Sequence, residues 1–201
     1  MPIVGILTSL SGSLPIQPAD RYAWLMVSTT NVNPTPPAAV PDRGQNRRDA
    51  RRRNLKRLLN PRHIAFIGGR GVAQAVEMLR TAEYTGELWA VHPHHDEIAG
   101  LPVFRSVAEL PAPPDAAFLY VPKAVTADVV SELAAVGVGG AICFAGGYAE
   151  LGAEGRLAQR QLDEAAGDVA LMGPNSNGFL NYFDGVPMWP VHDHEPLRTE
   201  R

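Results

Sequence analysis

A glycine-rich segment follows an apolar run in this 201-residue chain. Residues 63–67 are long enough for a buried strand and lead into Gly68-Gly69-Arg70-Gly71, after which a helical pattern begins at Val72. Glycines let the backbone turn tightly and approach a phosphate, and the first turn of a helix offers N–H groups and a positive dipole end. The segment therefore suits a phosphate-bearing ligand, and a glycine-rich turn without a ligand is the alternative.

The residues around this segment disfavour a nicotinamide dinucleotide. A dinucleotide fingerprint has a third glycine where Gln74 stands, and it places Asp or Glu at the end of the second strand to bind the ribose hydroxyls. Here the second apolar run, residues 87–91, is followed by His92 and Pro93. An arginine, which NADP would favour, does not follow until Arg105.

Three histidines follow the same run, at positions 92, 94 and 95. They could suggest a metal site, but no cysteine or suitably spaced pair of carboxylates accompanies them. We expect no metal here. A histidine that contacts an anionic or adenine group, or one that is simply solvated, is the preferred interpretation.

Five short apolar runs alternate with helical patterns, which predicts an α/β fold. We expect a Rossmann-like, doubly wound parallel sheet of about five strands. Ligands of such sheets bind at the carboxyl ends of the strands, and the glycine-rich segments fall there. The predicted strands are residues 63–67, 87–91, 116–121, 140–144 and 170–172.

The chain divides by composition into three parts. Residues 1–57 are rich in proline and arginine and are expected to be a disordered extension, with a solvated linker leading into a short helix. Residues 58–190 form the predicted domain, and residues 191–201 a flexible tail. A nucleic-acid arm is the alternative for the arginine run, but no aromatic residues are interleaved with it.

Overall composition narrows the partners and the compartment. The formal net charge is -3, which gives no global reason to expect nucleic-acid or membrane binding. The single cysteine, Cys143, lies within an apolar run and is interpreted as a small core residue. A chain without a disulfide framework is typical of a reducing compartment, so a cytoplasmic location is expected.

Read in order, these segments resemble the CoA-binding domain of NDP-forming acyl-CoA synthetases, the family that includes the alpha subunit of succinyl-CoA synthetase. The resemblance spans residues 58–190. Three features look like the feruloyl-CoA-ligase branch: the tryptophan in Glu87-Leu-Trp89, the Ala-Gly-Asp at residues 166–168, and the stretch from Asn181-Tyr182 to Trp189-Pro190. The matching motifs include Asn60-Pro61-Arg62, the Gly68–Gly71 segment, Val91-His92-Pro93, Val121-Pro122, Ala145-Gly146-Gly147-Tyr148 and Gly173-Pro174-Asn175.

The resemblance implies that the strand-end loops bind coenzyme A. Lys123 or Arg70 would supply positive charge for its phosphates, and Gly146, Gly147 and Asn175 would lie near the thioester end. No catalytic residue is assigned. The expected CoA-binding residues are Gly68, Gly69, Arg70, Gly71, His92, Pro93, Val121, Pro122, Lys123, Gly146, Gly147 and Asn175.

The chain also departs from the family pattern. Ser176 stands where the family has cysteine after Gly-Pro-Asn, and the sequence stops at Arg201. The family's phosphohistidine domain and ATP-grasp module would follow as further domains or partner subunits, so we expect a truncated ligase that binds CoA without catalysing the reaction alone. A stand-alone regulatory module that binds CoA or NAD(P) is the alternative, and the acid substrate stays open.

Overall fold

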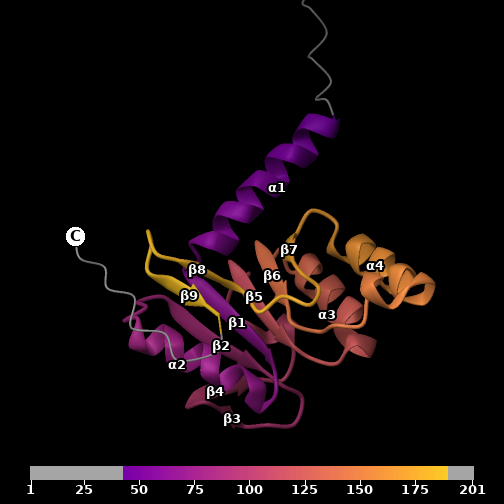
Figure 1. The fold of residues 1–201 in the computed structure, drawn as a ribbon. Helices are drawn as coiled ribbons and strands as arrows, with labels where there is room; N and C mark the ends of the chain where they lie inside the picture. The colour runs from indigo at the N-terminus through magenta and orange to yellow at the C-terminus, as the bar shows by residue number, and fades with distance from the viewer. Residues whose placement is uncertain (1–42, 190–201) are drawn as a thin grey trace, which may run out of the picture. The chain divides into compact units, whose positions relative to one another are not determined.

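The structure is a computed structural model that describes residues 43–189. Its centre is a seven-stranded sheet in the order β3-β4-β2-β1-β5-β6-β7, parallel except for β3 (Figure 1). The expected Rossmann-like α/β fold is confirmed. The strands are β1 (His63–Gly68), β2 (Glu87–Val91), β3 (Glu97–Ile98), β4 (Leu101–Phe104), β5 (Ala116–Tyr120), β6 (Gly140–Cys143) and β7 (Ala170–Met172).

The five predicted runs correspond to strands β1, β2, β5, β6 and β7. The prediction of about five strands was therefore too low. Strand β4 is short, contains Pro102 and is only partly buried, so it has no continuous apolar run to reveal it. A separate antiparallel pair, β8 (Phe179–Asn181) and β9 (Val186–Met188), was also missed.

Helices cover both faces of the sheet (Figure 1). Helices α3 (Lys123–Ala135) and α4 (Ala153–Ala166) pack on the face that carries Ala65 and Ile67 of β1. Helix α2 (Ala73–Thr81) and strand β9 pack on the face that carries Ile64 and Phe66. Short 3₁₀ turns complete the described part: η2 (Arg70–Val72), η3 (Val107–Glu109) and η4 (Ala149–Leu151).

An additional helix, α1 (Arg43–Leu59), precedes the sheet. Its Arg47 and Arg51 both form ion pairs with Asp168, at 3.1 and 3.5 Å, and Asn54 donates a hydrogen bond to the Asp168 carbonyl. Leu58, at its end, is 1% exposed in the core. No helix within residues 43–189 is both long and apolar enough to cross a membrane.

Helix α1 corrects the predicted domain boundary. The boundary between residues 57 and 58 falls inside the helix, so residues 43–57 belong to the domain rather than to a disordered extension. The arginine run was misread because its stabilising partners lie more than one hundred positions away along the chain. The rest of the predicted extension, residues 1–42, and the predicted tail, residues 191–201, lie outside the described residues.

Asp115 joins three elements at the amino end of the sheet. Its buried carboxylate accepts a 2.7 Å hydrogen bond from Arg57 Nε of α1 and a 3.0 Å bond from the Arg62 N–H. Its own N–H donates to the His63 carbonyl. Burial alone raises the pKa of Asp115, but the hydrogen bonds from Arg57 and Arg62 outweigh it and hold the pKa below its usual value. The carboxylate is therefore ionised while it holds α1 and β1 against β5.

We expect Asp115→Ala to lower the free energy of unfolding by about 3 kcal/mol, because it leaves the guanidinium of Arg57 without its buried partner. Asp168→Ala removes the more exposed ion pairs of α1 and should cost about 1 kcal/mol or less. Urea unfolding near neutral pH measures both variants. Equal losses would show that Asp115 is no more important than a surface ion pair.

The interaction of Asp115 with Arg57 and Arg62 should make the stability of the domain depend on pH. Because the folded-state pKa of Asp115 is lowered, its contribution is complete above the unfolded value of about 3.9 and is lost as pH falls through the folded value. Asp115→Ala should therefore flatten the acid limb of the stability curve.

Candidate functional site

The candidate site lies where the strand order changes direction. Strand β1 is flanked by β2 on one side and by β5 on the other, and α2 and α3 leave these strands on opposite faces of the sheet. Ligands of doubly wound sheets bind beyond the carboxyl ends of the strands at such a reversal, which in this sheet is the region after β1 and β5. All twelve predicted site residues lie at strand ends or in the loops after β1, β2, β5, β6 and β7, on this edge of the sheet.

Tyr120 explains two of the glycines. Gly68 pairs with Tyr120 across β1 and β5, and a Cβ on Gly68 would lie 2.3 Å from the Tyr120 carbonyl oxygen. A Cβ on Gly71 would lie 2.1 Å from the Tyr120 ring. Gly68 therefore needs glycine for packing within the protein, because the obstacle is backbone, whereas at Gly71 the obstacle is the side chain of Tyr120 in its present position. The ring is 40% exposed and lies against Phe144, with ring centroids 4.7 Å apart.

Gly69 differs from its neighbours because nothing lies within 4 Å of the Cβ that it lacks. Its carbonyl accepts the N–H of Val72, which starts the 3₁₀ turn before α2. The backbone at Gly69 is therefore open to an approaching group next to the amino end of a helix. The backbone of Arg70 lies in this turn, and its side chain is outside the described part of the structure.

Lys123 and Glu150 hold the glycine loop after β6. Lys123, the first residue of α3, donates through Nζ to the Gly147 carbonyl and lies 5.3 Å from the centroid of the Tyr148 ring. Glu150 accepts the Gly147 N–H at 2.7 Å. The pKa of Glu150 is lowered by hydrogen bonds from its own N–H and from those of Gly147 and Tyr148, so this carboxylate is ionised.

Sequence reasoning missed Glu150 as a member of this loop, although its spacing of three residues from Gly147 is the available signal. The loop after β7 lies against the same segment. The Asn175 N–H donates to the Ala145 carbonyl at 2.9 Å, and a Cβ on Gly146 would lie 3.3 Å from Asn175 Oδ1. Asn175 has a positive φ of 58°, which asparagine tolerates better than most residues. The structure therefore brings Lys123, Gly146, Gly147 and Asn175 together.

Two further predicted residues shape the start of α3. Pro122 is the N-terminal cap residue of the helix, and its carbonyl accepts a 3.0 Å hydrogen bond from Thr126 Oγ1. Val121 is half-buried and packs against the core on the α3 side. Both position Lys123 rather than present polar groups of their own.

His92 caps the turn that follows β2. Its Nδ1 accepts hydrogen bonds from the N–H groups of His94 and His95, at 3.1 and 3.2 Å. The ring is thereby fixed as the neutral tautomer with the proton on Nε2. Its pKa is lowered, first by burial and then by the neighbouring His95, His94 and Arg105. His92 therefore offers a donor where a NAD site has an acidic acceptor; Pro93 beside it is exposed.

No group of three or more His, Cys, Asp or Glu side chains within residues 43–189 is arranged to hold a metal ion. Cys143 is fully buried, and burial raises the pKa of its thiol, so it is protonated at neutral pH. This agrees with its interpretation as a core residue.

The His92 turn should respond to acid. Because the folded-state pKa of His92 is lowered, its contribution to stability is complete above the unfolded value of about 6.5 and is lost as pH falls through the folded value. Protonation of Nδ1 would then release the N–H groups of His94 and His95. An NMR titration should show these two amide signals moving together with the His92 ring. In His92→Asn, whose side-chain oxygen can accept without titrating, that movement should disappear; its persistence would assign the titration to another group.

Comparison with known proteins identifies the domain. The sequence profile of the CoA binding domain family matches residues 62–182. The chain is 36% identical over 141 residues to a trans-feruloyl-CoA synthase of an unknown prokaryotic organism, covering 67% of this chain and 20% of that protein. It is 33% identical to an ADP-forming acetate–CoA ligase of Archaeoglobus fulgidus, covering 63% of this chain and 19% of that one.

A ligase subunit and a first solved structure extend the comparison. The alpha subunit of an ADP-forming acetate–CoA ligase of Pyrococcus furiosus is 31% identical, covering 63% of this chain and 29% of the subunit. A crystal structure of a Pyrococcus horikoshii protein superposes with a TM-score of 0.64 at 26% identity, covering 69% of this chain and 33% of that one.

The second structure is an acetyl-coenzyme A synthetase of Ca. Korarchaeum cryptofilum, in complex with phosphate and ADP, with a TM-score of 0.63 at 25% identity. It covers 68% of this chain and 30% of that chain. The chain thus spans about a fifth of the length of the first two curated relatives. It belongs to the CoA binding domain family, and its domain is homologous to the one found in NDP-forming acyl-CoA ligases.

Proposed function

We propose that the loops at the carboxyl ends of the strands bind coenzyme A, as a substrate of acyl transfer rather than as a resident cofactor. The observation that carries this proposal is the open backbone at Gly69, next to the amino end of α2 and at the point where the strand order reverses. The CoA pyrophosphate would lie against the Gly68–Gly71 segment, because backbone N–H groups and a helix dipole stabilise phosphate there.

The remaining parts of CoA would extend to either side of this segment. His92 donates from Nε2 at the end of β2, which suits an acceptor on the nucleotide. On the other side, Tyr120 and Phe144 supply aromatic surface for the pantetheine chain. Lys123 adds positive charge while it holds Gly147, and Gly146 and Asn175 would border the thiol end.

The reaction proposed for the whole ligase joins a carboxylic acid to CoA at the expense of ATP. This chain would supply CoA binding and orientation. The phosphohistidine domain and the ATP-grasp module would be supplied by further domains or by partner subunits, as the existence of a named alpha subunit among the relatives suggests. The acid substrate would be selected jointly with those parts.

CoA should bind this chain more tightly than NAD, because His92 replaces the acidic acceptor that NAD requires. At a CoA concentration of 100 times the dissociation constant, the folded state should gain about 2.7 kcal/mol. Isothermal calorimetry with CoA, NAD and NADP measures the preference, and thermal unfolding measures the gain. Tighter binding of NAD would overturn the proposed function.

Gly69→Val should separate binding from stability. The Cβ of the added side chain has no protein atom within 4 Å, so the free energy of unfolding should change by about 0.5 kcal/mol or less. The same side chain would occupy the space that the pyrophosphate needs, and CoA affinity should fall at least about tenfold. Ala135→Val, at the far end of α3, is the matched control. Unchanged CoA affinity in a folded Gly69→Val protein would remove this segment from the site.

A further inference from the structure

Among residues 43–189, strand β7 forms one edge of the sheet and has a neighbour on one side only, β6. All three of its residues are partly buried, whereas all four residues of β6 are buried. An edge strand with exposed backbone groups is a ready template for pairing with another strand. The free edge of β7 lies on the flank of the sheet, in a different place from the loops of the proposed CoA site.

The backbone of Leu171 faces this free edge. The Ala170 N–H donates to the Gly139 carbonyl at 3.1 Å, on the side of β6. Because N–H and C=O groups of successive residues in a strand point to opposite sides, the groups of Leu171 point away from β6. One donor and one acceptor are thus presented to an incoming strand.

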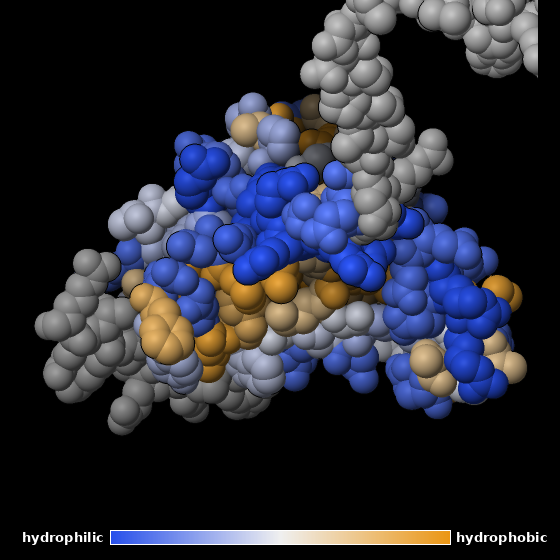
Figure 2. Space-filling model, turned by 90° about the horizontal axis from the view of Figure 1, so that it is seen from above, coloured by the Kyte–Doolittle hydropathy of each residue, from blue (hydrophilic) through white to orange (hydrophobic). Residues whose placement is uncertain are grey.

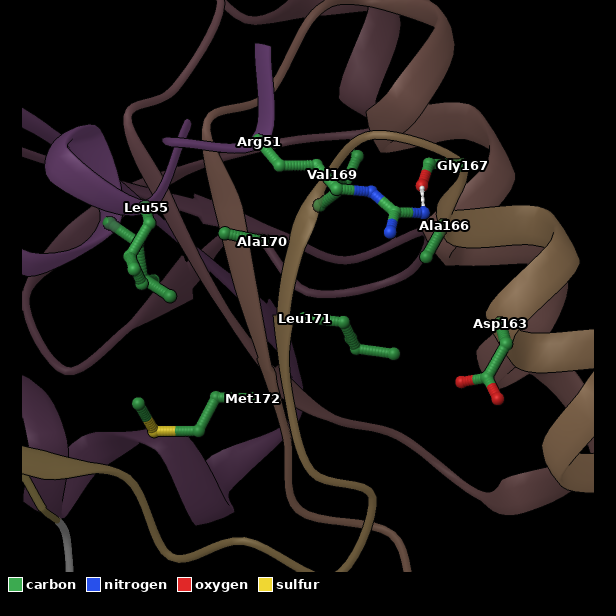
Figure 3. A pocket seen from close by; sticks show the side chains of 10 residues that line it. Arg51, Leu55, Asp163, Ala166, Gly167, Val169, Ala170, Leu171 and Met172 are labelled. Carbon is green, nitrogen blue, oxygen red and sulfur yellow. Dashed lines mark hydrogen bonds between the residues drawn. The ribbon is translucent and has the colours of Figure 1, made fainter. Parts of the chain in front are cut away.

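A groove of about 590 Å³ lies along this edge (Figure 3). Leu55 and Leu58 of α1 and Met172 line it on one face of the sheet, and Leu171 and Ala166 line it on the other. Leu55 is 45% exposed although it is apolar. The side chains of an added strand alternate between the two faces, so both apolar flanks would be covered.

The charge at one end of the groove indicates what kind of strand would fit. Arg51 lines the groove and reaches across its end to the Gly167 carbonyl (Figure 3). Eight of the 17 residues of α1 are Lys or Arg, and one is acidic. Figure 2 views this end of the molecule and shows strongly hydrophilic surface directly beside hydrophobic surface. Arg51 also pairs with Asp168, and Asp163 lines the groove as well, so the excess of positive charge is that of α1 itself. A polypeptide with carboxylates at the α1 end would complement it.

We propose that the free edge of β7 accepts one further β-strand, from a partner polypeptide that has β-branched side chains to cover both apolar flanks and is acidic at the end next to α1. Strand addition of this kind derives affinity from main-chain hydrogen bonds and specificity from the side-chain pockets. A second copy of this chain fits less well, because pairing two β7 edges would bring two strongly basic α1 helices together. A nucleic acid would fit less well too, because its phosphate backbone would leave the apolar flanks of the groove uncovered.

Two labelled peptides test the proposal on the full chain. One carries two Glu residues before an alternating Thr-Val segment, for parallel addition, and the other carries them after it, for antiparallel addition. Fluorescence anisotropy should show saturable binding of at least one of them. Replacing its Glu residues by Lys should weaken binding about tenfold. Absence of binding by both Glu peptides, or equal binding of the Lys peptide, would overturn the proposal.

Variants assign the binding to the edge of β7. Leu171→Pro removes the outward N–H without removing a bond to β6, and it should weaken the peptide about tenfold, whereas Leu171→Val should leave affinity within about twofold. Arg51→Gln should weaken the Glu peptide more than Arg47→Gln, because both arginines bind Asp168 but Arg51 lines the groove. Equal affinity of the proline and valine variants would contradict strand addition.

Hydrogen exchange on the unmodified chain keeps the test decisive if the proline variant does not fold. The Leu171 amide should become protected when the Glu peptide binds, while the Met172 amide, already directed to β6, should change little. An unprotected Leu171 amide in the complex would overturn the proposal. Protection that appears without peptide and rises with protein concentration would do the same, by assigning the edge to a second copy.

Discussion

The structure depends on one buried carboxylate at the start of β5. Asp115 binds the side chain of Arg57, the backbone of Arg62 and, through its own N–H, the His63 carbonyl. It therefore fixes the register of β5 against β1 at their amino ends. The two strands then run in parallel over five paired residues, which places Tyr120 opposite Gly68 at the carboxyl ends. The contacts of Asp115 at the amino ends of the strands thus determine which groups meet at the candidate site, at the carboxyl ends of the same strands.

The elements that could be predicted from the sequence are those whose signal is local. The central strands are continuous apolar runs because both of their faces are buried, and the strand-end glycines mark the edge where a ligand approaches. Strand β4 lacks that signal because it lies near the edge of the sheet and contains Pro102. Helix α1 was misread because Asp168 and Asp115, which bind its arginines, are distant in sequence.

The candidate site was predictable in position but not in its internal contacts. Gly68 and Gly71 were interpreted as ligand-facing, yet Tyr120 occupies the space beside both, through its backbone at Gly68, with which it pairs, and through its ring at Gly71. Lys123 was expected to face phosphate, and it also holds the Gly147 carbonyl. Such contacts follow from register and helix placement, which no local pattern encodes. Gly69 differs, because neither a neighbouring atom nor a positive φ accounts for its lack of a side chain.

The held loops have a thermodynamic consequence for binding. Gly147 is fixed through both its N–H and its carbonyl, and Asn175 lies beside Gly146, so under the proposed function these loops would have less conformational freedom to lose on CoA binding. Strand β7 leads directly into the segment that carries Asn175. A partner strand on the free edge of β7 would restrain the same segment from the opposite side, and any gain in CoA affinity would be matched by an equal gain in partner affinity. The free edge of β7 and the loops proposed to bind CoA are thus separate surfaces that one strand connects.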